Sequence, residues 1–151
     1  IEEDAVDVIK TRLMPLARVM TPNLPEAEIL AGCSISGEED FDKVARRLSD
    51  NGAVSVLLKA GHLENDELVD YFYNAEEDSM TRLPSRRVHT MNTHGTGCTL
   101  SSAFAAALAK GEDLTQAAIS AKEYISQAII SGADYQIGGG HGPVNHFFRL
   151  S

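Results

Sequence analysis

The sequence predicts an α/β fold in which a partial central sheet is flanked by helices. Segments with helical spacing of apolar residues alternate along the chain with short apolar runs, an order typical of α/β proteins. The clearest strand is 53–59 (AVSVLLK), and the clearest helix is the alanine-rich 96–110. Two strong strands and two weaker ones are few for a sheet that is covered on both faces. We therefore expect a single domain that is incomplete in this chain.

The first quarter of the chain reads as helix, strand, helix. Apolar residues recur at helical spacing over 3–14, and 18–21 is a short strand candidate that runs into a proline. Pro25 suits the first turn of a helix over about 25–31, and Gly32 suits its end.

The next elements depend on one capping motif and three apolar runs. Ser36 and Glu39 form an S-x-x-E pattern, which predicts a capping box that opens a helix over 36–49. The run 53–59 follows as a buried strand, 68–73 as a second strand and 86–90 as a weaker third.

Two helices and a glycine-rich tail complete the chain. Gly111 ends the helix over 96–110, and Asp113 with Gln116 caps a second helix that runs to about 131. The remaining segment, IGGGHGPVNHFFRLS, is rich in glycine and then aromatic.

Composition and charge exclude several classes of partner. The formal net charge is −9, which disfavours nucleic acid and anionic membranes because no basic face is available to neutralise phosphates. No apolar run is long enough for a membrane span, and no signal-peptide pattern opens the chain. Two distant cysteines, Cys33 and Cys98, favour a reducing compartment, so a cytoplasmic location is expected. The histidines are scattered, which disfavours a structural zinc site.

The most informative segment is NTHGTGCT, residues 92–99. It places two glycines directly before a long helix, where free backbone amides and the helix dipole can bind an anion. It is neither G-x-G-x-x-G, because Leu100 stands at the third glycine, nor a Walker A loop. Spacing alone favours a simple glycine-rich helix entry over an anion site. Cys98 is either a base for a substrate hydroxyl or a small packed residue.

The longer string NTHGTGCTLSSA, residues 92–103, closely resembles the anion-hole signature of the phosphomethylpyrimidine kinases, a branch of the ribokinase-like superfamily. Most of that superfamily carries Gly-Ala-Gly-Asp there, with the aspartate as catalytic base, whereas this branch and the related pyridoxal kinases carry Gly-Thr-Gly-Cys. The resemblance implies that Cys98 is the base. It also implies that the backbone amides of Gly95, Thr96, Gly97 and Cys98 form the anion hole, and that Thr93 belongs to the nucleotide site.

Two upstream segments are similar to the same family. TPNLPE, residues 21–26, resembles its TPN-x-x-E segment. An amide and a carboxylate at a strand end can order Mg²⁺ around ATP phosphates, although a plain strand-to-helix turn has the same composition. The resemblance assigns Asn23 and Glu26 to Mg²⁺ and ATP. Lys59 can reach a phosphate, but Ala60 departs from the family's usual Lys-Gly-Gly-His, and a solvated strand-end lysine is an equal alternative.

The tail GHGPVNHF resembles the end of phosphomethylpyrimidine kinases, although chemistry alone gives it no role. Together the resemblances imply the C-terminal nucleotide and phosphoryl-transfer part, residues 1–151, of a ribokinase-like domain whose N-terminal strands are missing. The implied activity is transfer of the ATP γ-phosphoryl group to a small molecule, hydroxymethylpyrimidine and then its monophosphate, in thiamine biosynthesis. The alternatives are a pyridoxal kinase of the same branch and a non-catalytic nucleotide-binding fragment. A missing part would leave a sheet edge and an apolar face exposed, so a homo-oligomer is expected.

Overall fold

The computed structural model describes residues 3–50, 52, 55–60 and 67–150. The chain divides into two compact units. The first unit comprises Ile1–Glu64 and Leu68–Pro84, and the second comprises Asn65–Glu67 and Ser85–Ser151. Each unit is described by itself below.

The first unit begins with a helix of changing pitch. α1 spans Glu3–Val8 and continues as a π-helical segment, Ile9–Leu13, and a 3₁₀ turn, Met14–Leu16. The expectation of one helix over 3–14 is confirmed in position, but its second half is not α-helical. The Thr11 hydroxyl donates to the Asp7 carbonyl at 2.7 Å, a side-chain bond to the preceding turn that bends helices.

The second helix, α2, spans Leu24–Ala31 and confirms the predicted helix over 25–31. Asn23 is its N-cap residue, and the helix ends at Gly32, whose φ of 63° lies in the left-handed region. Glycine adopts this conformation without the steric cost that a Cβ brings.

The third helix, α3, spans Phe41–Asp50, so the expected start at Ser36 is wrong. A 3₁₀ turn, Glu38–Asp40, precedes it. The Ser36 amide donates to Asp40 Oδ2 at 2.8 Å. Asp40 thus takes the place that the sequence pattern gave to Glu39, and the chain enters α3 through the tighter turn.

The sheet contains the strands β1 (Val19–Met20), β2 (Ser55–Leu58), β3 (Glu67–Asn74) and β4 (Ser79–Arg86) in that spatial order. β1 and β2 run parallel, whereas β2 and β3 run antiparallel with Leu57 opposite Phe72. The sheet is therefore mixed.

Three strand predictions are confirmed and one is wrong. The short strand candidate over 18–21 is β1. The strand predicted over 53–59 is β2, although 53–54 lie outside the described residues, and the strand predicted over 68–73 is β3. The weak strand predicted over 86–90 is wrong, because β4 ends at Arg86. β4 lies at the sheet edge and carries Pro84 and several polar residues, so it lacks the apolar run by which buried strands are found.

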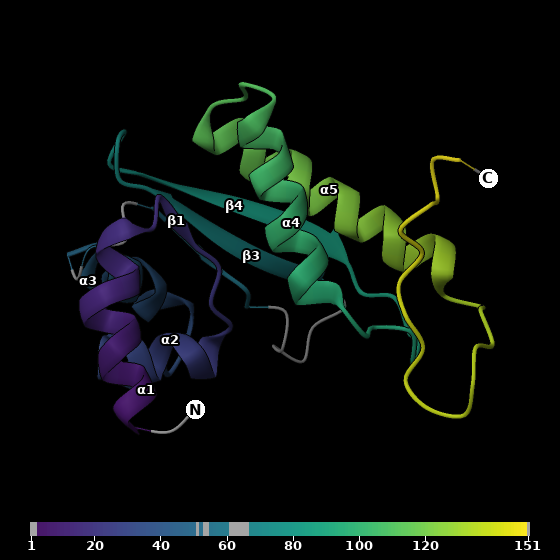
Figure 1. Cartoon of the computed structure of the whole chain (residues 1–151), viewed down its shortest axis with the longest axis horizontal. Helices are drawn as coiled ribbons and strands as arrows, with labels where there is room; N and C mark the ends of the chain where they lie inside the picture. Colours follow the sequence, from purple (N-terminus) through teal and green to yellow (C-terminus); the bar gives the residue numbers. More distant parts are fainter. Residues whose placement is uncertain (1–2, 51, 53–54, 61–66, 151) are drawn as a thin grey trace. The chain divides into compact units, whose positions relative to one another are not determined.

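The core of the first unit lies between the sheet and its helices. Phe41, Val44 and Leu48 repeat at helical spacing along α3 and pack in one cluster with Val56 and Leu58 of β2. Figure 1 shows α1, α2 and α3 grouped beside β1. This packing fixes the carboxyl ends of β1 and β2, where predicted ligand residues lie.

The second unit is a helical pair followed by the tail. α4 spans Thr96–Ala109 and α5 spans Leu114–Gly132, which confirms both predicted helices. Asp113 Oδ1 accepts a hydrogen bond from the Gln116 amide at 2.7 Å, so Asp113 caps α5 as predicted. The tail after α5 returns beside the residues that lead into α4 (Figure 1). Among the described residues, no helix has the length and apolar character that crossing a membrane requires.

Candidate active site

The entry to α4 is a loop of residues 93–98, called the glycine loop below. Its N-cap residue Gly95 has φ 85° and ψ 2°, in the left-handed region. A Cβ built at Gly95 would meet no atom of the described residues within 4 Å. Glycine is therefore required here for backbone conformation and not for space. Among the described residues, no side chain makes a capping hydrogen bond at this end of the helix.

The amides of the first turn of α4 are available to an anion. In the part of the chain that the structure describes, the backbone amides of Gly97 and Cys98 have no acceptor. The Thr96 amide differs, because it donates to the Thr93 carbonyl at 3.3 Å and the Thr96 hydroxyl donates to the same oxygen at 2.7 Å. Free amides at the positive end of a helix attract anions. The loop can thus hold a phosphoryl-sized group.

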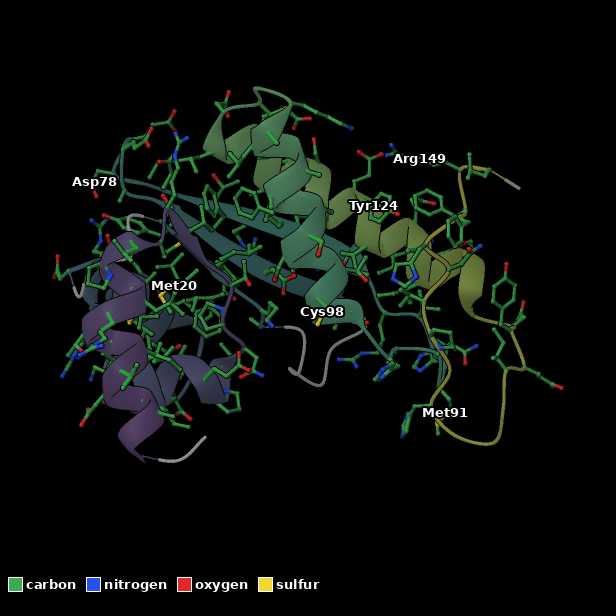
Figure 2. All side chains as sticks on the ribbon, viewed as in Figure 1. Met20, Asp78, Met91, Cys98, Tyr124 and Arg149 are labelled. Carbon is green, nitrogen blue, oxygen red and sulfur yellow. The ribbon has the colours of Figure 1, made fainter. Side chains whose placement is uncertain are left out.

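Cys98 lies in the same turn as these amides, with an exposed thiol. Figure 2 shows Cys98 at the start of α4. It borders a cavity of about 520 Å³ that runs along α4, a volume suited to a small molecule. Cationic, aromatic and polar side chains line the same cavity: Lys110, Tyr124, His146, Arg149, Ser102 and Ser120.

The C-terminal tail supports the glycine loop by pairing with it. The His94 amide donates to the Gly142 carbonyl at 3.1 Å, and the Val144 amide donates to the His94 carbonyl at 3.4 Å. His94 and Pro143 thereby form a parallel bridge. The tail, which the sequence identified only as a family marker, fixes the backbone one residue before Gly95.

Hydrogen bonds of the Thr99 hydroxyl also support the glycine loop. The Thr99 hydroxyl donates to the Gly95 carbonyl at 2.8 Å, and His146 Nε2 lies 3.0 Å from the same Thr99 oxygen. A hydroxyl has one proton to donate, so His146 Nε2 must carry the proton of this second bond. The Tyr124 hydroxyl donates a hydrogen bond to the His146 carbonyl at 2.7 Å. Sequence reasoning missed Thr99 and His146, because nothing local signals a contact between residues so far apart.

In the first unit, Asn23, Glu26 and Lys59 are brought together at the carboxyl ends of β1 and β2. Asn23 and Lys59 form a parallel bridge, and the Lys59 amide donates to the Pro22 carbonyl at 2.9 Å. Ligands of open α/β sheets gather at this edge.

Asn23 and Glu26 also cap α2 reciprocally. Asn23 Oδ1 accepts from the Glu26 amide, and Glu26 Oε2 accepts from the Asn23 amide, both at 2.8 Å. The cap uses only Oε2 of the Glu26 carboxylate, so Oε1 takes no part in it. The described residues hold no group of three or more His, Cys, Asp and Glu side chains suited to a metal ion. A single carboxylate still fits Mg²⁺ that is shared with nucleotide phosphates and water.

The departure at Ala60 is accommodated without strain. Ala60 is 1% exposed and packs in the core cluster, and its amide donates to Asp70 Oδ1 at 3.0 Å. Among the described non-glycine residues, only Asp78 has a positive φ, so a glycine is not needed at this position for conformation. Residues 61–62 of the Lys-Ala-Gly-His segment lie outside the described part.

The predicted site residues therefore form two groups in different units. The first group, in the first unit, contains Asn23, Glu26 and Lys59, and the second group, in the second unit, contains Thr93, Gly95, Thr96, Gly97 and Cys98.

Comparison with known proteins places both groups in one family. The family described as phosphomethylpyrimidine kinase matches residues 1–145. The chain is 46% identical over 147 residues to a hydroxymethylpyrimidine/phosphomethylpyrimidine kinase of Rhizobium meliloti, covering 97% of this chain and 54% of that protein. It is 49% identical over 146 residues to a thiamine biosynthesis bifunctional protein of Geobacter sulfurreducens, covering 97% of this chain and 29% of that protein.

Solved structures agree with the predicted fold class. An ADP complex of Bacillus subtilis pyridoxal kinase matches with a TM-score of 0.89 and 33% identity, covering 100% of this chain and 58% of that one. Staphylococcus aureus pyridoxal kinase in complex with AMP-PCP and pyridoxal matches with a TM-score of 0.87 and 32% identity, covering 97% and 54%. The chain thus spans about half the length of most of these relatives. The chain, which contains the glycine loop, the N-cap residue Asn23 and the mixed sheet, belongs to the phosphomethylpyrimidine kinase family. It has part of the ribokinase-like fold.

Proposed function

We propose that the intact protein is an ATP-dependent kinase of thiamine biosynthesis, which phosphorylates the hydroxymethyl group of hydroxymethylpyrimidine and then the resulting monophosphate. One observation carries the proposal. Gly95 is left-handed, and among the described residues the amides of Gly97 and Cys98 have no acceptor, in the same turn as an exposed thiol. An anion site beside a base is what phosphoryl transfer to a hydroxyl requires.

The glycine loop and Cys98 have separate roles in this proposal. The amides of Gly97 and Cys98 stabilise the charge of the transferring group through fixed donors, which need no reorganisation during the reaction. Cys98 Sγ accepts the proton of the acceptor hydroxyl. Gly95 and Thr96 shape the turn, and Thr93 holds it through the bonds that its carbonyl accepts.

The first unit supplies residues for the nucleotide. Bound Mg-ATP provides the γ-phosphoryl group and a metal charge that neutralises its oxygens. Glu26 offers its remaining carboxylate oxygen to Mg²⁺ or its water, and Asn23 orients Glu26 through the reciprocal cap. Lys59 adds a positive charge at the adjacent strand end. Support comes from S. aureus pyridoxal kinase, which has been solved in complex with AMP-PCP.

A second candidate, a pyridoxal kinase, is favoured by the structural similarity to pyridoxal kinases at TM-scores of 0.89 and 0.87. The sequence relatives favour the pyrimidine. The test is ADP release by the intact protein at fixed Mg-ATP, with hydroxymethylpyrimidine and pyridoxal as parallel acceptors. Faster release with the pyrimidine is the expected result. Preference for pyridoxal would keep the site roles and change the substrate, and no release with either would overturn the kinase proposal.

Two further expectations stay predictions. A homo-oligomer is expected because β1 lies at an open edge of the described sheet. A cytoplasmic location follows from the proposed use of ATP and from the two unpaired cysteines.

A further inference from the structure

Asn92 is a buried polar residue that the proposed chemistry does not use. It lies directly before the glycine loop and is only 6% exposed. A buried amide must find hydrogen-bond partners, because an unsatisfied polar group is costly in a protein interior. The partners that Asn92 finds are on a distant element.

The Asn92 side chain caps the C-terminal end of α5. Its Nδ2 donates to the carbonyls of Gly132 at 2.8 Å, Ala133 at 3.2 Å and Tyr135 at 2.7 Å. The last carbonyls of a helix have no intrahelical donor, and the two amide protons are shared among three carbonyls at and just beyond the end of α5. Thr90 contributes to the same contact. Its hydroxyl donates to the Ala133 carbonyl at 2.8 Å and accepts from the backbone amide of Asn92 at 3.1 Å.

The tail packs tightly against the other side of this amide. A Cβ built at Gly142 would lie 2.0 Å from Asn92 Oδ1, a distance that no real contact allows. The Gly142 carbonyl also accepts the hydrogen bond from His94. Gly142 must therefore be glycine, because only then can the tail both approach Asn92 and pair with the glycine loop.

These contacts fix the backbone on both sides of Thr93. Asn92 is tied to α5, and His94 is tied to the tail. On the far side of Gly95, Thr99 holds the Gly95 carbonyl. The left-handed turn at Gly95 thus lies between residues that hydrogen bonds hold in place. The amides of the glycine loop therefore have their orientation before any ligand binds.

We propose that Asn92 is a positioning residue for phosphoryl transfer, which holds the glycine loop in its anion-binding conformation by tying it to the end of α5. The proposal rests on the proposed function for its catalytic consequence. Asn92 acts through the backbone of the loop and not by contact with the substrate. Gly142 belongs to the same device, because only glycine lets the tail close over the Asn92 amide.

The first test measures turnover of Asn92→Ala and Asn92→Asp in the intact protein. Asn92→Asp keeps the shape but replaces the donors with an oxygen that faces three carbonyls. Both variants should lower kcat by about 10- to 100-fold, the scale for misplacing a reacting group by about 1 Å. KM should change little, because the lost interaction acts in the transition state. Unchanged kcat in both variants would overturn the proposal.

Ile125→Val is the matched control for simple destabilisation. Ile125 is buried in α5, away from its C-terminal end, so the variant loosens the same helix without touching the Asn92 tie. It should lower the thermal midpoint and keep kcat. An equal loss of kcat in Ile125→Val and Asn92→Ala would mean that stability of the unit, and not loop position, sets the rate, which also overturns the proposal.

A double-mutant cycle tests the coupling between the two residues. Gly142→Ala should lower kcat when Asn92 is present, because the new methyl group displaces the Asn92 amide. In the Asn92→Ala background the colliding atom is gone, so the same change should have little further effect. Equal fold-losses in the two backgrounds would contradict the proposed coupling.

A readout without turnover separates this inference from the proposed function. The amide chemical shifts of Gly95, Gly97 and Cys98 in the intact protein should move in Asn92→Ala and stay in place in Ile125→Val. If the wild-type protein phosphorylated neither acceptor, the kinase proposal would fail, and these shifts would still decide whether Asn92 positions the loop. Unmoved shifts in Asn92→Ala would overturn the inference whatever the activity.

Discussion

Asn23 and Glu26 cap α2 through each other: each side chain accepts a hydrogen bond from the backbone amide of the other residue, both at 2.8 Å. The same two residues are the ones that the sequence assigned to Mg²⁺ and ATP. Their structural and proposed functional roles can be separated, because the cap needs an oxygen at position 26 and Mg²⁺ needs a charge there.

We expect Glu26→Gln to keep the fold and to need more Mg²⁺ for turnover. The glutamine Oε1 can still accept from the Asn23 amide, so the free energy of unfolding should change little. Loss of the carboxylate should raise the Mg²⁺ concentration needed for half-maximal turnover. Turnover and chemical denaturation of the intact protein measure the two effects.

Asp113→Ala serves as the control for capping alone. It removes the cap of α5, where Asp113 Oδ1 accepts from the Gln116 amide, at a cost of about 1 kcal/mol. Turnover should be preserved in this variant. An unchanged Mg²⁺ requirement in Glu26→Gln would remove Glu26 from the nucleotide site and leave it as a helix cap.

Cys98→Ala should lower turnover by roughly 10² or more, the scale for a lost general base. Cys98→Asp should recover part of this loss, because the family resemblance places an aspartate base at this position in most of the ribokinase-like superfamily. Steady-state kcat with the preferred acceptor is the measurement. Cys33→Ala is the matched control, since Cys33 is a partly buried thiol that packs against the core of the first unit. Equal turnover in Cys98→Ala and wild type would exclude Cys98 as the base.

Local patterns in the sequence predicted the features that local physics determines. α4 and α5 were placed to within about one residue, because helical spacing and caps act over a few neighbouring residues. The same holds for the turn at Asn23 and for the glycines before α4. The Ser36 capping box failed although its pattern is also local, because Asp40 competes for the same amide.

The parts of the site that the sequence did not reveal depend on contacts between distant residues. Thr99 and His146 are 47 residues apart, and Asn92 reaches the end of α5 some 40 residues further along the chain. No periodicity or cap motif encodes such pairs. The tail could be identified by resemblance, but its action on the glycine loop becomes visible only once its backbone is seen to pair with His94.

Gly95→Ala should lower turnover through backbone strain alone. The added Cβ meets no atom of the residues that the structure describes within 4 Å, but a φ of 85° is unfavourable for alanine, at a cost of about 1–2 kcal/mol. The loop can relieve the strain by leaving the left-handed region, which turns the Gly97 and Cys98 amides away from the anion. Gly95→Asn should be milder, because asparagine enters this region more readily. kcat and the thermal midpoint of both variants check the expectation.

Gly111→Ala is the matched control for that strain. Gly111 has φ 93° and also has open space around its missing Cβ, but it lies in the turn after α4, away from the glycine loop. It should lose similar stability and keep its kcat. If both alanine variants lowered kcat equally, the conformation of Gly95 would have no special part in the reaction.

The ion pair between Arg46 and Asp78 should make the stability of the first unit depend on pH. Arg46 of α3 bonds to Asp78 in the turn between β3 and β4, and its guanidinium lies 4.9 Å from the centre of the Tyr73 ring. The hydrogen bond from Arg46, followed by that from Tyr73, lowers the pKa of Asp78 below its ordinary value of 3.8. A carboxylate with a depressed folded-state pKa stabilises the fold above its unfolded pKa and loses that contribution as pH falls through the folded value.

Asp78→Asn isolates this contribution, because asparagine has the same shape and tolerates the positive φ of 48° at this position. The variant should be less stable than wild type near neutral pH, and the difference in unfolding free energy should shrink as the pH falls below about 4. Chemical denaturation at a series of pH values measures it. In an Arg46→Met background the same substitution should have little effect at any pH, since the main cause of the lowered pKa is gone. A stability difference that stayed constant with pH, or that survived without Arg46, would show that Asp78 supports the turn through its backbone conformation and not through its charge.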